Sequence, residues 1–171
     1  MSTVRFASLF LVLGVTACTQ THSVKAPPAF SPIVPNGQVT QGRCHMGGCS
    51  WAKWVGVDTL SASDSEVVLD AKPLYGSSEH QSADGQTGTS QYPASAQGVN
   101  IRWDAQPETE RIVCSHTAPS VANQVLPLNP STPVSGSQES AARLYFAACH
   151  SYFDDYTSGI SKFGYDVKDQ N

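Results

Sequence analysis

With Cys18 in the leader set aside, four of the five cysteines remain, and they limit the folds open to this 171-residue chain more than any other feature: Cys44, Cys49, Cys114 and Cys149. An even number of cysteines in an exported chain indicates two disulfides. Four cysteines allow three pairings, and the sequence leaves all three open. We favour Cys44–Cys49, because the glycines between them permit a tight turn, together with Cys114–Cys149. The second bridge closes a long loop, worth about 4 kcal/mol in the chain-entropy model if it is unstrained.

The first 17 residues have the regions of an export signal. Residues 1–5 carry one positive charge, and the run from Phe6 to Val15 is almost entirely apolar. An apolar run of about ten residues is too short to span a bilayer as a helix, but it fits the core of a signal peptide. The sequence therefore predicts a signal peptide over residues 1–17 and an oxidising compartment for the mature chain.

The residues that close this leader are Val15-Thr16-Ala17-Cys18: an aliphatic residue, two small residues and a cysteine. The tetrad resembles the lipobox of bacterial lipoproteins. The resemblance covers the leader alone, and it implies cleavage after Ala17 and a lipid-modified N-terminus at Cys18. Thr19 stands where lipoproteins kept at the inner membrane often have aspartate, so the resemblance favours the outer membrane, facing the periplasm or the surface. An ordinary secretory signal followed by a coincidental cysteine is the alternative.

The mature chain is long enough for one domain with its own core. Residues 18–43 are predicted to be a lipidated N-terminus and a proline-rich tether, because Ala26–Pro35 contains four of the eleven prolines. Such a segment favours extended polyproline II and resists helix formation. Residues 44–171 are then predicted to form a single globular domain.

The middle of the chain has the pattern of β-strands. We predict strands over residues 51–60, 66–75, 99–104 and 110–115, where β-branched and aromatic residues alternate with polar ones. The segment 76–98 is rich in Gly, Ser and Gln, and it is predicted to be a loop or a weak hairpin.

One strong amphipathic helix is predicted near the C-terminus. Ser137 suits the N-cap, and Gly159 can end the helix. Apolar residues at three- and four-residue spacings place Cys149 on the buried face, where Cys114 on a strand can reach it. The predicted fold class is α+β: a small antiparallel sheet of four to five strands, packed with one C-terminal helix and held by two disulfides.

Three cysteines lie beside a histidine, in Cys44-His45, Cys114-Ser115-His116 and Cys149-His150. Free thiolates and imidazoles could bind Zn²⁺ or copper if these pairs converged. The spacings match no zinc finger or ribbon, and disulfides would use every thiolate. We therefore expect structural disulfides, surface histidines and no metal ion or other cofactor. Metal binding through His45, His116 and His150 is the alternative, and a count of free thiols separates the two.

Other patterns give little support for catalysis. Ser50 and Lys53 have a Ser-x-x-Lys spacing, but they fall in a predicted strand and not at a helix N-terminus. Asp154 and Asp155 could bind a cation or act as acid and base, yet adjacent residues point in different directions on a helix. The aromatic residues could stack on a glycan if exposed, although their periodicity predicts core positions. We therefore expect no enzyme activity.

Charge limits the possible partners. The formal net charge is −4 and the charges are dispersed, which argues against a nucleic-acid partner, because that affinity depends on Lys and Arg at phosphates. The leading hypothesis is a non-enzymatic binding module of the bacterial cell envelope, with an envelope protein or a cell-wall glycan as partner. An inhibitor or immunity protein is one concrete form. A metal-binding lipoprotein is the alternative, and an enzyme that hydrolyses the cell wall comes third.

Overall fold

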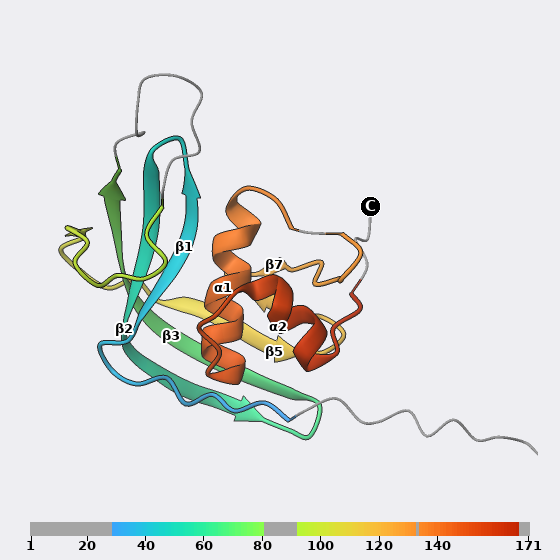
Figure 1. The fold of residues 1–171 in the computed structure, drawn as a ribbon. Coiled ribbons are helices and arrows are strands. Elements are labelled where there is room, and N and C mark those ends of the chain that lie inside the picture. The colour runs from blue at the N-terminus through green and yellow to red at the C-terminus, as the bar shows by residue number, and fades with distance from the viewer. Residues whose placement is uncertain (1–28, 81–91, 133, 168–171) are drawn as a thin grey trace, which may run out of the picture.

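The computed structural model describes residues 29–80, 92–132 and 134–167 (Figure 1). The predictions of a signal peptide and of lipid attachment at Cys18 concern residues outside these ranges. The described residues form an α+β fold with a curled antiparallel sheet, two helices and two disulfides. No helix among them is both long enough and apolar enough to cross a membrane.

The sheet is larger than the sequence predicts. Within the described residues it has seven strands instead of four or five. Six follow the order β1-β2-β3-β5-β6-β7, and β4 pairs with β3. The strands are β1 (Val39–His45), β2 (Gly48–Ala62), β3 (Glu66–Glu79), β4 (Arg102–Trp103), β5 (Glu110–Ser115), β6 (Ser120–Val121) and β7 (Gln124–Val125). Three of them are two residues long, too short for any alternation to show in the sequence.

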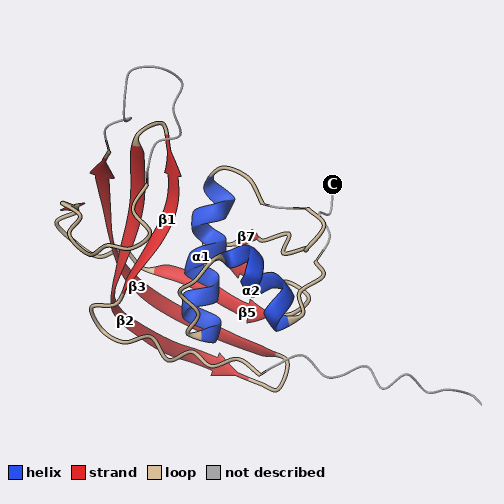
Figure 2. Cartoon of the chain, in the orientation of Figure 1, coloured by secondary structure: helices blue, strands red, loops and turns tan. Residues whose placement is uncertain are grey.

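The long hairpin of β2 and β3 supports both ends of the sheet. β1 pairs with β2 at residues 48–53, at the open end of the β2–β3 hairpin, whereas β5 pairs with β3 at residues 66–71, beside the turn of that hairpin. Two irregularities in β2, between Trp54 and Gly56 and between Thr59 and Ser61, interrupt the register. Bulges of this kind bend a strand and increase its twist, so the sheet curls around the helices (Figure 2).

Two helices occupy the region where the sequence predicts one helix from Ser137 to Ser158. They are α1 (Ser137–His150) and α2 (Tyr156–Phe163). α1 ends because Ser151 takes a left-handed conformation with a φ of 51°. α2 begins at a new N-cap, Asp155, whose carboxylate accepts a hydrogen bond from the Ser158 amide. The apolar spacing continues across the break, which is why the sequence does not reveal it.

The core lies between α1 and the curled sheet. β3 and β5 present alternate residues to it, as their predicted periodicity requires. The largest fully buried side chains include Trp51, Trp54, Tyr145, Phe146, Leu69, Ile112, Leu126 and Leu128.

The two disulfides are those that the sequence favours. Cys114–Cys149 joins β5 to α1 with a Cα–Cα distance of 5.5 Å. Cys44–Cys49 joins facing residues of β1 and β2 with a Cα–Cα distance of 4.0 Å.

An extended segment precedes β1 and lies against the end of α1; we call residues 29–35 the strap. Phe30 and Val34 pack against the core, while the residues between them face outward or are half-buried. The Ser31 amide donates a hydrogen bond to the Cys149 carbonyl at 2.8 Å. From residue 29 on, the segment predicted to be a tether therefore contacts the domain. An extended, proline-rich chain can pack against a domain as well as separate it from an anchor.

Candidate functional site

The β1–β2 hairpin ends in a cross-linked turn, which we call the stapled tip (residues 44–49). Cys44 and Cys49 face each other across the two strands and are joined by a disulfide. Met46 and Gly47 form the turn itself, with φ angles of 50° and 81°. Two central residues with positive φ define a type I′ turn, the kind whose twist matches that of a hairpin.

Met46 is an unusual residue for this position. Type I′ turns favour Asn, Asp or Gly there, because a left-handed conformation costs other residues about 1–2 kcal/mol. Its side chain is 87% exposed, more than any other large hydrophobic residue that the structure describes. The fold therefore keeps an apolar side chain in water in a conformation that does not suit it. Strain of this kind clusters at functional sites.

The turn is also held from the side, at Gly47. The Gly47 carbonyl accepts a hydrogen bond from the His80 amide at 2.6 Å, and the Gly47 amide donates to the Tyr92 hydroxyl at 3.1 Å. A Cβ atom at Gly47 would lie 3.1 Å from the His80 carbonyl oxygen, so the position requires glycine for space as well as for its φ angle. The disulfide and these two hydrogen bonds constrain the stapled tip from both sides.

Ser78 and His80 form a serine–histidine pair that the sequence analysis missed. The Ser78 hydroxyl lies 2.7 Å from His80 Nε2 and also accepts a hydrogen bond from the Trp51 indole at 2.7 Å. Ser78 is only 4% exposed, and among the described residues no carboxylate is hydrogen-bonded to His80. A buried hydroxyl that accepts from an indole is a poor nucleophile, so the pair serves to position the Trp51 ring and the chain beside the tip.

The three histidines of the metal alternative do not come together. His116 and His150 lie 6.2 Å apart between ring centroids, but His45 belongs to the stapled tip, at the end of β1 that lies away from the C-terminal end of α1 (Figure 1). All four cysteines of the Cys–His alternative and its neighbours are in disulfides, so none offers a thiolate to a metal ion. Within the described ranges, no group of three or more His, Cys, Asp or Glu side chains is placed to hold a metal ion.

His150 is buried, although the sequence analysis expects a surface histidine. Its ring stacks on Phe163 at 3.9 Å between centroids and lies 5.4 Å from Phe30 of the strap. Burial, with a smaller repulsion from His116, lowers the pKa of His150 to about 4. The imidazole is therefore neutral at physiological pH.

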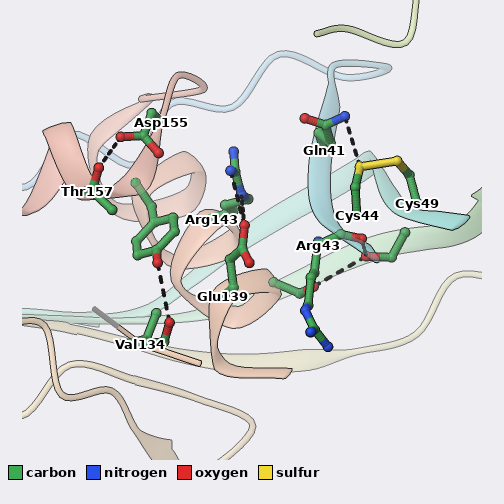
Figure 3. A network of polar contacts seen from close by, with 12 residues as sticks. Gln41, Arg43, Cys44, Cys49, Val134, Glu139, Arg143, Asp155 and Thr157 are labelled. Atoms are coloured by element: carbon green, nitrogen blue, oxygen red, sulfur yellow. Dashed lines mark hydrogen bonds and ion pairs between the residues drawn. A yellow bond between two sulfur atoms is a disulfide. The ribbon is translucent and has the colours of Figure 1, made fainter. Parts of the chain in front are cut away.

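Asp154 and Asp155 line a cleft of about 450 Å³ between β1, residues 94–96 and the α1–α2 connection. The Asp155 carboxylate caps α2 and also accepts from Thr157. Burial raises the pKa of Asp155, but these hydrogen bonds outweigh it and hold the pKa below its ordinary value. Asp155 is thus ionised at neutral pH and unsuited to donate a proton. Arg143 and Gln41 line the same cleft (Figure 3).

The other sequence candidates take structural positions. Lys53 lies over the Trp103 ring, 4.8 Å from its centroid, while the Ser50 hydroxyl donates to the Arg43 carbonyl. The Ser-x-x-Lys pair is therefore not assembled. Trp51 is fully buried and unavailable to stack on a sugar.

Comparisons of this chain with protein-family models, curated proteins and solved structures give no match. The candidate site therefore depends on its own geometry. Of its residues, the two cysteines and His45 are candidates in the sequence, whereas the sequence does not predict the exposed turn position of Met46. The sequence does contain one sign of this turn: a Met-Gly pair lies between two cysteines, at a position where Asn-Gly is the usual pair.

Proposed function

We propose that this chain is a lipid-anchored protein of the bacterial cell envelope whose stapled tip binds another envelope protein. The observation that carries the proposal is the exposed Met46 side chain in a left-handed turn position. An inhibitor or immunity protein directed at a cell-wall hydrolase is the form that we favour. Such a protein needs a rigid recognition element and no catalytic group. Its proposed anchor is Cys18, and its proposed place is the outer membrane.

A narrow, rigid tip suits a concave partner. In Figure 1 the β1–β2 hairpin extends past the near end of α1. Substrate clefts of enzymes are concave and lined largely by apolar groups. A turn already fixed by a disulfide and by both backbone groups of Gly47 loses little conformational freedom on binding. Methionine adapts its unbranched side chain to irregular apolar surfaces.

The first experiment measures inhibition and affinity. The mature chain is added to purified cell-wall hydrolases: a lysozyme, a lytic transglycosylase and an amidase. We expect it to inhibit at least one of them and to bind it with a Kd below 1 μM. Met46→Ala should weaken that binding at least tenfold, because it removes the only apolar group at the turn.

A matched control is Leu60→Ala, which truncates another exposed apolar residue, on β2 and away from the tip. It should bind as the unsubstituted chain does. The proposal fails if no hydrolase is inhibited, or if Met46→Ala and Leu60→Ala bind equally well.

The anchor is tested separately by mass spectrometry of the native protein. We expect cleavage before Cys18 and acyl groups on that residue. An intact leader with an unmodified Cys18 thiol would contradict the anchor and leave the tip proposal standing on its binding data.

A cell-wall glycan is the competing partner, and the cleft beside Arg143 is where the structure offers it a site. This cleft combines charged and amide side chains with Phe153 at its wall, a composition suited to a sugar. Titration with soluble cell-wall oligosaccharides, followed by NMR shifts of the Phe153 and Arg143 amides, separates the proposals. Shifts at the cleft without any at Met46 would favour the glycan.

A further inference from the structure

The strap lies over His150, which is buried at the C-terminal end of α1, and over the half-buried His116 that follows β5. The Phe30 ring stacks on His116 at 4.9 Å and approaches His150 at 5.4 Å. Besides the Ser31–Cys149 bond, the Ser151 hydroxyl contacts the carbonyls of Ser31 and Ile33. The Ser151 hydroxyl has one hydrogen and donates to one of these carbonyls at a time, so two hydrogen bonds and one aromatic ring hold the strap on the end of α1.

A chain of hydrogen bonds fixes which nitrogen of His150 carries hydrogen. The Tyr145 hydroxyl donates to the Ser115 carbonyl at 3.0 Å and lies 2.8 Å from the Tyr165 hydroxyl. Tyr145 has only one hydrogen, so Tyr165 must donate to Tyr145. Tyr165 has then no hydrogen left for His150 Nε2, 2.7 Å away, and Nε2–H must be the donor. His150 Nδ1 is therefore the basic nitrogen.

His150 Nδ1 is buried, and no described residue hydrogen-bonds to it. The titratable groups that face the ring are His116 from the segment after β5, Tyr145 from α1 and Tyr165 from the segment after α2. No carboxylate among the described residues compensates a charge there. The ammonium of Lys162 lies over Phe163, whose ring stacks on His150. A proton on Nδ1 would add a charge where only neutral or positive groups are near.

We propose that the strap is an acid-releasable element: it is docked while His150 is neutral and detaches when Nδ1 is protonated. Detachment removes Phe30 from the ring and lets water reach the imidazolium. The proton is taken from solvent, and no covalent bond changes.

Release of the strap changes how far the domain can extend from the membrane. This consequence rests on the proposed anchor at Cys18. The seven residues of the strap span at most about 24 Å when extended. Acid would therefore lengthen the anchor by this distance and let the stapled tip reach partners farther from the membrane.

Amide hydrogen exchange of the mature chain tests the proposal without any reference to the anchor. The Ser31 amide is protected by the Cys149 carbonyl. With a freed His150 pKa of about 6.5, its protection factor should fall up to roughly 20-fold between pH 7 and pH 5, after correction for intrinsic exchange. The Tyr165 amide, bonded to Ile160 within the α2 end, should stay protected at both pH values.

Three variants sharpen the result. His150→Phe should keep Ser31 protected at pH 5, whereas His45→Phe, at the exposed tip, should respond to acid as the unsubstituted chain does. Phe30→Ala should lower Ser31 protection already at pH 7, which keeps the test informative if His150→Phe does not fold. Equal Ser31 protection at pH 7 and pH 5 would overturn the proposal. So would a simultaneous loss at Ser31 and Tyr165, since that is global unfolding.

Discussion

The two disulfides of this chain lie in opposite surroundings. Cys114–Cys149 joins β5 to α1, and neither cysteine has any exposed surface. Cys44–Cys49 closes a solvent-facing turn in which Met46 is 87% exposed. The first bridge fixes two layers of the core against each other. The second fixes the shape of a surface element that contributes little to the core.

The polar groups near each bridge follow the same division. At the core end, the buried Tyr145 hydroxyl donates to the Ser115 carbonyl, and the buried Tyr165 hydroxyl donates to Tyr145. At the tip, the backbone of Gly47 holds the turn while the side chains of His45 and Met46 remain in solvent. The comparison teaches that similar covalent chemistry stabilises the core at one end and fixes the shape of an exposed turn at the other.

Removal of the core bridge should have the largest effect on stability. The double substitution Cys114→Ala with Cys149→Ala opens a loop with a sequence separation of 35. We expect a loss of about 4 kcal/mol in the free energy of unfolding, and more if cavities remain. Urea denaturation followed by tryptophan fluorescence measures it. A loss below about 1 kcal/mol would mean that the bridge does not organise the core.

Tyr145→Phe should cause the second-largest loss in the free energy of unfolding. The substitution leaves the Ser115 amide and carbonyl and the Tyr165 hydroxyl without their buried partner. Buried unsatisfied groups of this kind cost about 3 kcal/mol in sum. The same denaturation experiment checks this value, with Tyr92→Phe, whose hydroxyl accepts from the Gly47 amide at the tip, as the matched control. An equal loss in both variants would contradict the proposed difference between the two ends.

Removal of the tip bridge should cost less stability and more affinity. Cys44→Ala with Cys49→Ala opens a loop with a sequence separation of only 5, worth about 2 kcal/mol in the chain-entropy model. Binding to the inhibited hydrolase should weaken at least tenfold, because the freed turn must then be ordered on binding. Calorimetry and denaturation on the same preparation measure both. Unchanged affinity would show that a prearranged turn is not required.

The sequence predicts the parts of the fold that are long and periodic. The strands at residues 66–75 and 110–115 are present because their alternation extends over several residues. Both favoured disulfides are present, although the sequence alone left the pairing open. β1 was missed because Val39–His45 contains few large apolar residues and follows a proline-rich stretch. The break between α1 and α2 was missed because the apolar spacing continues across Ser151. Gly159, predicted to end the helix, lies inside α2, which ends at Gly164.

The candidate site was harder to predict than the fold. The spacing of Cys44 and Cys49 indicates a tight turn, but neither the positive φ of Met46 nor its exposure can be read from it. His150 was expected at the surface because its helix position lies beside the apolar stripe. The strap and Phe163 bury it, and both come from segments distant in sequence. Tertiary contacts of this kind decide burial independently of local periodicity.

The most direct test of the stapled tip is the substitution Met46→Asn, measured for stability and for hydrolase binding on the same preparation. Asparagine suits the left-handed position of a type I′ turn, so the free energy of unfolding should rise by about 1 kcal/mol. Affinity should fall at least tenfold, since the displayed apolar group is gone. A variant that is more stable and binds poorly supports a turn kept for recognition. A variant that binds as tightly as the unsubstituted chain contradicts it.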